Sequence, residues 1–258
     1  MTTYASRREA GRHPAWRVPA GLLLLSLIPL LAGAARVGEL ASSPEVTPDN
    51  ARFVEDPFPV VAHIVGATVW CVLGAFQFVP SLRRGRWHRR AGKVALPFGL
   101  VAAASGIWMA LFYPLPHPNS VALDLIRTLF GTGMLVALVL ALGAILRRDV
   151  PSHRAWMIRG YAIGVGAGSQ ALIGIPLLLA FGEPNVASNI GLHVAGWLVN
   201  LWVAERMIRG RPLRVPRPGT APPRSHGPCL SGGPREGDGR AARTGPGDGT
   251  GRRSSARW

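Results

Sequence analysis

The chain has 258 residues, of which 48% are hydrophobic, and a formal net charge of +16. A charge of this size is compatible with nucleic-acid binding, but the arginines lie at the ends of hydrophobic stretches and in the C-terminal tail. Because no folded soluble domain is left to present them, we exclude nucleic acid as a partner.

Six hydrophobic stretches follow one another along the chain, at residues 18–35, 60–80, 94–112, 121–146, 155–181 and 189–208. About 20 apolar residues cross the hydrocarbon core of a bilayer as a helix. Only helices and closed barrels satisfy their backbone hydrogen bonds in lipid, and these stretches lack the alternation of a barrel strand. The sequence therefore predicts an all-α fold, with a six-helix transmembrane bundle within residues 18–210 that contacts the lipid bilayer.

The first stretch also fits a signal peptide, because arginines precede it and Ala32-Gly33-Ala34 supplies small residues for cleavage. Its 18 residues are long for a signal sequence and sufficient for a span. We favour a retained helix. Cleavage stays open as the alternative, and it leaves the orientation of the other five helices unchanged.

Positive charges alternate between the two sides of the predicted bundle. They cluster before the first helix and after the second, fourth and sixth helices, in the segments 7–17, 83–93, 147–159 and 206–214. The connections on the other side carry only Arg36 and Arg52, among five acidic residues. The positive-inside rule then predicts a plasma-membrane protein with both termini in the cytoplasm, residues 1–17 forming the N-terminal segment.

Residues 211–258 consist largely of Pro, Gly, Arg and Ser. A segment with so few apolar side chains cannot offset the entropy of ordering it, so we predict a disordered basic tail in the cytoplasm. Anionic lipid headgroups are a candidate partner for its charges. Cys71 and Cys229 do not form a disulfide framework, and we expect Cys71 to pack within a helix.

Two of the predicted cytoplasmic loops resemble each other. One contains Leu82-Arg83-Arg84 and then His88-Arg89, and the other Leu146-Arg147-Arg148 and then His153-Arg154. This echo predicts that the second and third helices and the fourth and fifth are related hairpins. Convergence between short basic loops is the alternative.

Ionisable side chains inside a membrane are costly and mark candidate functional sites. His63 and His193 lie about one turn below the outer ends of their helices, and Asp124 and Arg127 are three residues apart near the outer start of another. We expect these four side chains to form one cluster near the outer face. His88 and His153 stand at the cytoplasmic starts of two helices, whereas His117 is expected in a loop.

Two histidine pairs, one on each side of the membrane, suit two haem b groups that pass an electron across the bilayer. Nearby arginines would then hold the propionates. The outer pair alternatively binds a metal ion, with Asp124 as a third ligand. The structural alternative is that these histidines are solvated or bonded to backbone carbonyls, and lipid phosphates are a further partner for the cytoplasmic pair.

Other polar residues in the helices are expected to form interhelical hydrogen bonds and ion pairs. We group Arg127, Arg154, Arg159 and Glu205 as further polar candidates. Glu205 lies near the cytoplasmic end of its helix, and Arg206, Arg209 and the region of Arg159 are its candidate partners. Gly160, Gly164 and Gly168 repeat every four residues and predict close packing of the fifth helix against a neighbour. Breaks in the middle of a helix are not evident, and only Pro97 and Pro176 are candidates for them.

The chain resembles an uncharacterised bacterial family of multi-pass membrane proteins, a domain of unknown function of the DUF 2306 type. The segments that carry the resemblance are His63-Ile-Val-Gly, Gly74-Ala-Phe-Gln77-Phe, His88-Arg89-Arg-Ala-Gly92-Lys, His153-Arg154-Ala-Trp156-Met-Ile-Arg159 and residues 197–205. They cover the second to sixth predicted helices, and the resemblance implies no established activity. Helix number and histidine placement also give a distant similarity to di-haem cytochromes of the ferric-reductase kind.

Three functions remain open from the sequence: a haem b protein for transmembrane electron transfer, a transporter, and a non-enzymatic component for membrane assembly or sensing. No Walker motif, dinucleotide-binding fingerprint or nucleophile elbow is present. The sequence therefore leaves open whether the protein is an enzyme and what its substrate is.

The predicted orientation is tested with single cysteines in a chain whose own two cysteines are replaced by serine. A membrane-impermeant maleimide added outside intact cells should label cysteines placed in residues 41–56. Cysteines in residues 82–90 should react only after the cells are opened, because the basic loops are expected in the cytoplasm. The reverse pattern would overturn the orientation.

Overall fold

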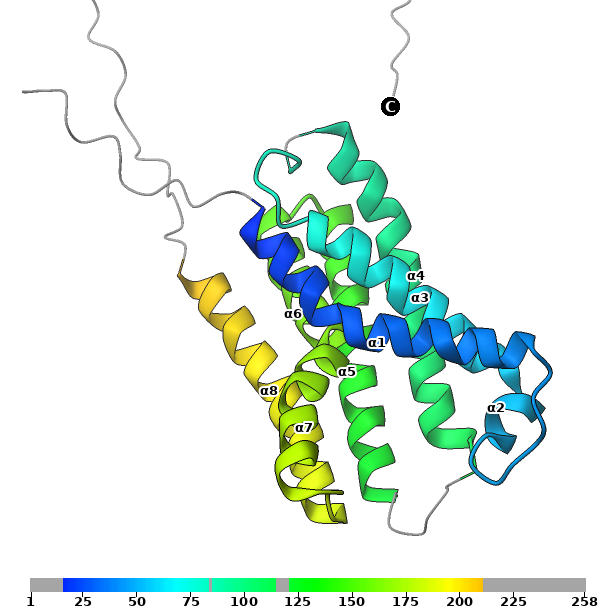
Figure 1. The fold of residues 1–258 in the computed structure, drawn as a ribbon. Helices are drawn as coiled ribbons and strands as arrows, with labels where there is room; N and C mark the ends of the chain where they lie inside the picture. Colours follow the sequence, from blue (N-terminus) through cyan, green and yellow to red (C-terminus); the bar gives the residue numbers. More distant parts are fainter. Residues whose placement is uncertain (1–15, 84, 115–120, 211–258) are drawn as a thin grey trace, which may run out of the picture. The chain divides into compact units, whose positions relative to one another are not determined.

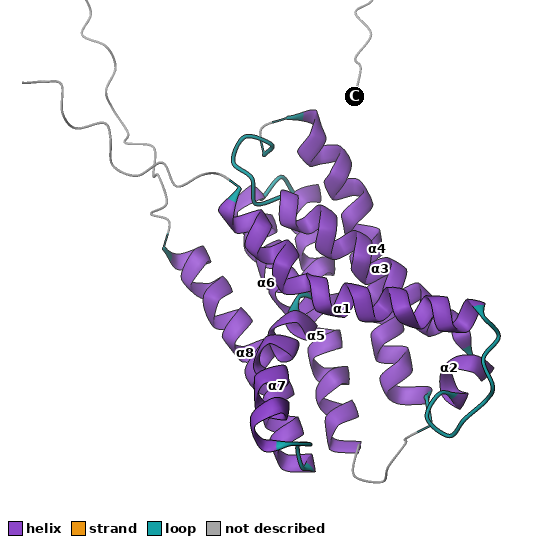
Figure 2. Ribbon diagram, viewed as in Figure 1, coloured by secondary structure: helices purple, strands orange, loops and turns teal. Residues whose placement is uncertain are grey.

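A computed structural model describes residues 16–83, 85–114 and 121–210. The predicted tail, the N-terminal segment before residue 16 and His117 lie outside the described residues. Within them the chain forms only helices (Figures 1 and 2): α1 Arg17–Ala41, α2 Ala51–Glu55, α3 Pro57–Phe76, α4 Arg86–Phe112, α5 Val121–Leu146, α6 Val150–Gly164, α7 Gly166–Phe181 and α8 Val186–Arg209. Six spans are long and apolar enough to cross a membrane, with α6 and α7 together making one. The predicted all-α, six-span fold is confirmed.

Two helical hairpins form the centre of the bundle. α3 packs along α4, α5 packs along α6, and α4 and α5 join the two hairpins. α1 crosses the outside of this group against α3 and α7 (Figure 1), and α8 packs against α6 and α7. The hairpins are the two that the loop sequences predict, although their common origin stays a prediction.

The two ends of the bundle differ in charge. We name the end where α4 and α6 begin and α8 ends the basic end, and the end that carries α2 and the start of α5 the cavity end. The side chain of Asp149 accepts a hydrogen bond from the Ser152 amide at 3.1 Å and so caps α6 at the basic end. Hydrogen bonding from the side chain of Ser152, together with this bond from its amide, holds the pKa of Asp149 below its ordinary value.

The fifth span is broken in its middle, which the sequence did not predict. α6 ends at Gly164, α7 begins at Gly166, and Val165 between them is not helical. Neither Pro97 nor Pro176 causes the break, because they lie inside α4 and α7. Glycine is a poor helix former, and here it also gives room to indole rings from two other helices.

Those rings belong to Trp70 of α3 and Trp197 of α8. A Cβ atom on Gly164 would lie 2.5 Å from Nε1 of Trp70, and one on Gly166 would overlap the Trp197 indole. Gly168 in turn adjoins the backbone of Leu25 in α1. The predicted packing role of the glycines is therefore correct, but they face different neighbours rather than a single helix.

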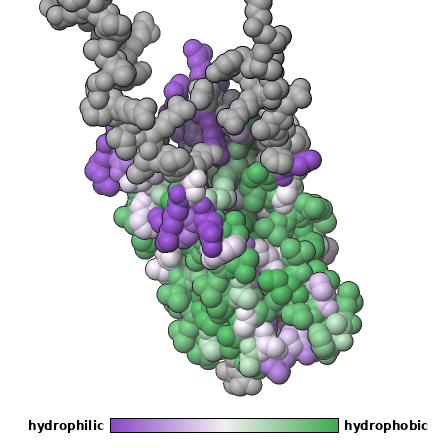
Figure 3. Space-filling model, turned by 90° about the vertical axis from the view of Figure 1, so that its left-hand side faces the viewer, coloured by the Kyte–Doolittle hydropathy of each residue, from purple (hydrophilic) through white to green (hydrophobic). Residues whose placement is uncertain are grey.

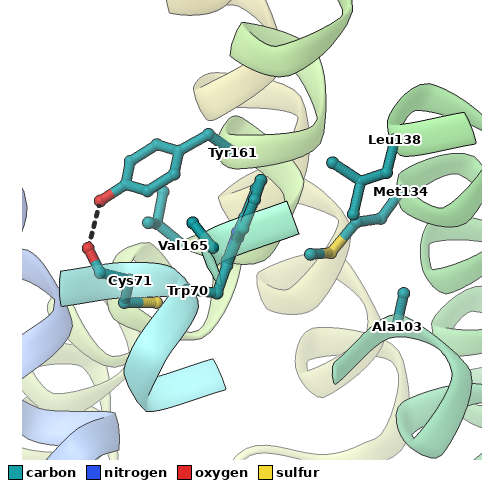
Figure 4. Close-up of a cluster of buried hydrophobic side chains, with 8 residues drawn as sticks. Trp70, Cys71, Ala103, Met134, Leu138, Tyr161 and Val165 are labelled. Carbon is teal, nitrogen blue, oxygen red and sulfur yellow. Dashed lines mark hydrogen bonds between the residues drawn. The ribbon is translucent and has the colours of Figure 1, made fainter. Parts of the chain in front are cut away.

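A buried cluster joins the two hairpins at this level (Figure 4). It contains Trp70, Cys71, Ala95, Ala103, Met134, Leu138, Tyr161 and Val165. The Tyr161 hydroxyl donates a hydrogen bond of 2.9 Å to the Cys71 carbonyl, which links α6 to α3. Cys71 is only 5% exposed and packs as the sequence predicts.

The outside of the bundle is apolar. Figure 3 shows one face on which hydrophobic side chains cover the middle and hydrophilic ones gather toward the upper end. Leu129, Leu179 and Phe181 are 68%, 82% and 83% exposed. So much exposed apolar surface on a monomer marks contact with lipid or with other chains, and with six candidate spans it identifies a membrane protein.

Replacing Gly164 by Ala should destabilise the bundle, because the new methyl group would collide with a fully packed indole. Overpacking of this kind costs about 1–3 kcal/mol, so we expect a clear fall of the melting temperature in detergent. Gly21→Ala is the matched control, since nothing lies within 4 Å of its Cβ position. Equal melting temperatures for the two variants would contradict this account of the break.

Candidate functional site

A cavity of ≈ 650 Å³ enters the bundle from the cavity end. Arg52 and Tyr113 lie at its mouth, and Trp70 and Gly164 line it at the level of the helix break. The four side chains that the sequence groups together, His63, Asp124, Arg127 and His193, all line this cavity. They come from three helices, α3, α5 and α8, so the bundle brings them together although they are far apart in the chain.

The orientation of His63 is set by α4. Its Nδ1 lies 2.8 Å from the carbonyl oxygen of Ala102. A carbonyl only accepts, so Nδ1 donates and the neutral ring keeps its lone pair on Nε2. Gly106 provides the space, because a Cβ there would lie 3.2 Å from the ring. The Ser105 hydroxyl makes a longer contact with Nδ1, at 3.4 Å.

His193 is held in the same way within its own helix. Its Nδ1 lies 2.9 Å from the carbonyl oxygen of Asn189, one turn earlier in α8. The Gln170 side-chain amide of α7 donates to the His193 carbonyl at 3.2 Å and fixes this turn against the neighbouring helix. The cavity is therefore lined by two neutral imidazoles in the same tautomer. In each ring Nδ1 makes the bond to the backbone carbonyl, and Nε2 keeps its lone pair.

The Asp124 and Arg127 side chains form the predicted pair one turn apart, with 3.0 Å between Oδ1 of Asp124 and Nη1 of Arg127. Asp124 is directed to this partner, and within the described residues no three His, Cys, Asp or Glu side chains come close enough to hold a metal ion. In this structure Asp124 therefore does not complete a metal site with the two histidines.

The mouth of the cavity contains residues that the sequence analysis did not select. α2 supplies Arg52 and Phe53, and the Arg52 guanidinium lies 4.7 Å from the Phe53 ring centre. The Tyr113 hydroxyl donates a hydrogen bond of 2.7 Å to the carbonyl oxygen of Asp56. Burial, with the nearby negative charge of Asp56, raises the pKa of Tyr113 above its ordinary value. A five-residue helix gives too short a pattern for the sequence to reveal it.

His88 and His153 both lie at the basic end, in the first turn of α4 and of α6 respectively. Nδ1 of His153 lies 2.8 Å from the Ala141 carbonyl oxygen in α5. Within the part of the chain that the structure describes, Nδ1 of His88 and both side-chain amide atoms of Gln77 are buried without a hydrogen-bond partner. The two histidines share an end of the bundle, and the ≈ 650 Å³ cavity does not reach them.

Two of the predicted polar residues, Arg159 and Glu205, form an interhelical ion pair, and Arg209 makes a further contact with Glu205. Nε of Arg159 lies 2.6 Å from Oε1 of Glu205, and Arg209 approaches the other oxygen at 3.7 Å. This pair joins α6 to α8. Arg154 lies in the first turns of α6, half-buried.

The comparison with known families agrees with the architecture. A family model described as "Predicted membrane protein (DUF2306)" matches residues 60–208, which run from α3 to α8. The chain belongs to this family. No curated protein and no solved structure matches the chain. The matched region contains every predicted site residue, including both histidine pairs.

The Arg159–Glu205 pair should contribute to the docking of α8. In a double-mutant cycle with Arg159→Gln and Glu205→Gln, we expect a coupling of about 0.6–1.7 kcal/mol, the range of polar contacts between membrane helices. The measurement is reversible unfolding in mixed micelles. Combining Glu205→Gln with Arg147→Gln provides the control and should be additive. A coupling of zero for the first pair would show that the contact is not stabilising.

Proposed function

We propose that the cavity binds haem b, that His63 and His193 would be the residues that hold its iron, and that the protein transfers electrons in the membrane. The observation that carries the proposal is that the two imidazoles have the same location and the same hydrogen bonding. Both line one cavity, and both have Nδ1 held by a backbone carbonyl. A metal-ligating histidine usually has its other nitrogen fixed in this manner.

Haem suits this pair better than a bare metal ion. The porphyrin itself supplies four nitrogen ligands, so two histidines complete the coordination of its iron. A bare transition metal commonly needs three or more protein ligands, and within the described residues no such group is present. When bound, haem supplies a centre that accepts and releases one electron without a change of its ligands.

The rest of the lining also suits a flat apolar ring with charged edges. Glycines 106, 131 and 164 leave the walls without side chains, and Trp197 and Met134 add apolar surface. Arg52 and Arg127 lie toward the open end, where propionates would emerge. A guanidinium has five N–H donors, so the contact of Arg127 with Asp124 leaves donors for a carboxylate.

Electron transfer across the whole bilayer requires a second centre, for which His88 and His153 are the candidates. We also propose that both chain termini lie in the cytoplasm of a plasma-membrane protein, as the arginine distribution indicates. The cavity then opens to the outside, and the second histidine pair lies near the cytoplasmic face.

The visible spectrum of the purified protein tests this function. We expect a Soret band that shifts on reduction, because the iron would be six-coordinate with two imidazoles. His63→Ala and His193→Ala should each lose the cavity haem and keep the helical circular dichroism of the wild type. His13→Ala, at a histidine that precedes the first helix in the sequence, is the matched control and should keep the cavity haem.

Haem content per chain separates one centre from two. Two haems that fall to one in His63→Ala and to one in His153→Ala would support electron transfer through both pairs. One haem that only the cavity variants remove would restrict the proposal to the cavity. Wild-type protein that stays colourless after haem is supplied during expression and purification would overturn it.

A transporter is the second candidate, and the broken fifth span favours it. In secondary transporters, discontinuous helices commonly form the substrate site near the middle of the membrane. Here Gly164 and Ala167, on either side of the break, both line the cavity. A cysteine at position 167 that impermeant reagents reach from each side of the membrane in turn would support alternating access. Labelling from one side only would favour the haem site.

A further inference from the structure

Four cations share one face at the start of α4. Arg86, Arg89, Arg90 and Lys93 occupy positions i, i+3, i+4 and i+7, which lie on one side of a helix. All four are exposed, and together they are the described residues that line a hollow of ≈ 230 Å³. We name these residues the cationic face.

The charge of the cationic face is not compensated within the described part of the chain. None of the four side chains has a carboxylate within ion-pair distance there. Two acidic groups of the basic end are already engaged elsewhere, since Glu205 pairs with Arg159 and Asp149 caps α6. Like charges one turn apart repel each other, so an anion bound among them would relieve a standing repulsion.

The start of α4 adds to the attraction for an anion. Gly85 precedes the helix and has no side chain to cap it. The first N–H groups of a helix lack intrahelical partners, and the helix dipole places partial positive charge there. Phosphate groups are bound at helix N-termini for this reason. The dipole and the four side chains therefore act on the same place.

Aromatic side chains indicate the depth of this site in the bilayer. The Trp87 and Trp16 rings each pack edge-on against Phe76, with ring centres 6.2 Å and 6.1 Å from its own. Tryptophans concentrate at the level of the lipid headgroups. Because Trp87 directly follows Arg86, the cationic face begins at that level rather than in open water.

An apolar stripe continues the cationic face toward the middle of the membrane. Val94, Pro97 and Val101 follow Arg90 on the same side of α4, at spacings of three and four residues. Val94 and Val101 are each 44% exposed. A molecule with a charged head and a long apolar chain matches such a surface, whereas a free phosphate ion would use only its charged part.

We propose that the cationic face is a binding site for an anionic phospholipid, with the phosphate among the four cations and an acyl chain along Val94, Pro97 and Val101. This site is independent of the cavity and of the proposed haem. Its ligand class follows from the junction of the charged hollow with the exposed apolar stripe.

Native mass spectrometry of the full-length protein in a neutral detergent tests the site. Phosphatidylglycerol is the probe, phosphatidylcholine the zwitterionic comparison, and inorganic phosphate the free anion. We expect one phosphatidylglycerol to bind more tightly than the others, and millimolar phosphate at constant ionic strength to leave it bound. Arg90→Gln should weaken this binding about fivefold and Arg89→Gln/Arg90→Gln about thirtyfold, since each cation near a membrane surface contributes about 1 kcal/mol.

The matched control is Arg147→Gln/Arg148→Gln, which removes two consecutive exposed arginines from the same end of the bundle. It should keep the wild-type affinity. Equal losses in both double variants would show general attraction to basic residues and overturn the site. Displacement by inorganic phosphate would assign the hollow to a free anion and overturn the lipid. Equal binding of the two lipids would overturn the proposal as a whole. Melting temperatures without lipid verify that every variant is folded.

Discussion

The close contact of two indole rings with two glycines determines how the helices pack in the middle of this bundle. Trp70 lies against Gly164 and Trp197 against Gly166, so α3 and α8 approach the fifth span on either side of Val165. Between lipid-embedded helices there is little hydrophobic driving force, and close van der Waals packing has to replace it. The same indoles line the cavity, which means that the packing of the core also defines the inner part of the candidate site.

The close packing of the helices also determines which hydrogen-bond partners the interior polar side chains find, because a membrane interior supplies no water to satisfy them. His63 uses a carbonyl of α4 that already belongs to a helix, and a carbonyl oxygen has a second lone pair to accept this bond. Such a bond across two helices requires a small residue where the ring lies, and Gly106 is that residue. Tyr161 is satisfied in a similar way by the Cys71 carbonyl. Backbone acceptors, rather than other polar side chains, therefore hold much of the interior in place.

Periodicity and charge in the sequence were sufficient for the six spans, for the pairing of the helices in two hairpins and for selecting four side chains that line one cavity, His63, His193, Asp124 and Arg127. These features depend on composition over 20 or more residues, or on the depth of a residue in its helix, and both can be counted. The break at Val165 could not be predicted, because glycine in a membrane helix indicates packing and interruption equally well. The sequence also did not reveal the short helix α2 or the places of Tyr113 and Trp70 in the cavity wall. These features depend on which helices are neighbours, and a single sequence does not contain that information.

The arrangement of small and large residues on α4 explains how one helix serves two surfaces. Ala91, Ala95, Gly99 and Ala102 are buried, and Gly99 lies against the Trp70 ring, so this side permits the close approach of α3. Arg90, Val94 and Val101 stand one position before buried residues and so lie about 100° round the helix from them, and the other residues of the cationic face lie still further from the buried side. A side chain on one face does not share partners with the other, and substitutions without shared partners are usually additive in their effects. The interior site and the surface site can therefore vary independently, although both depend on the position of the same helix.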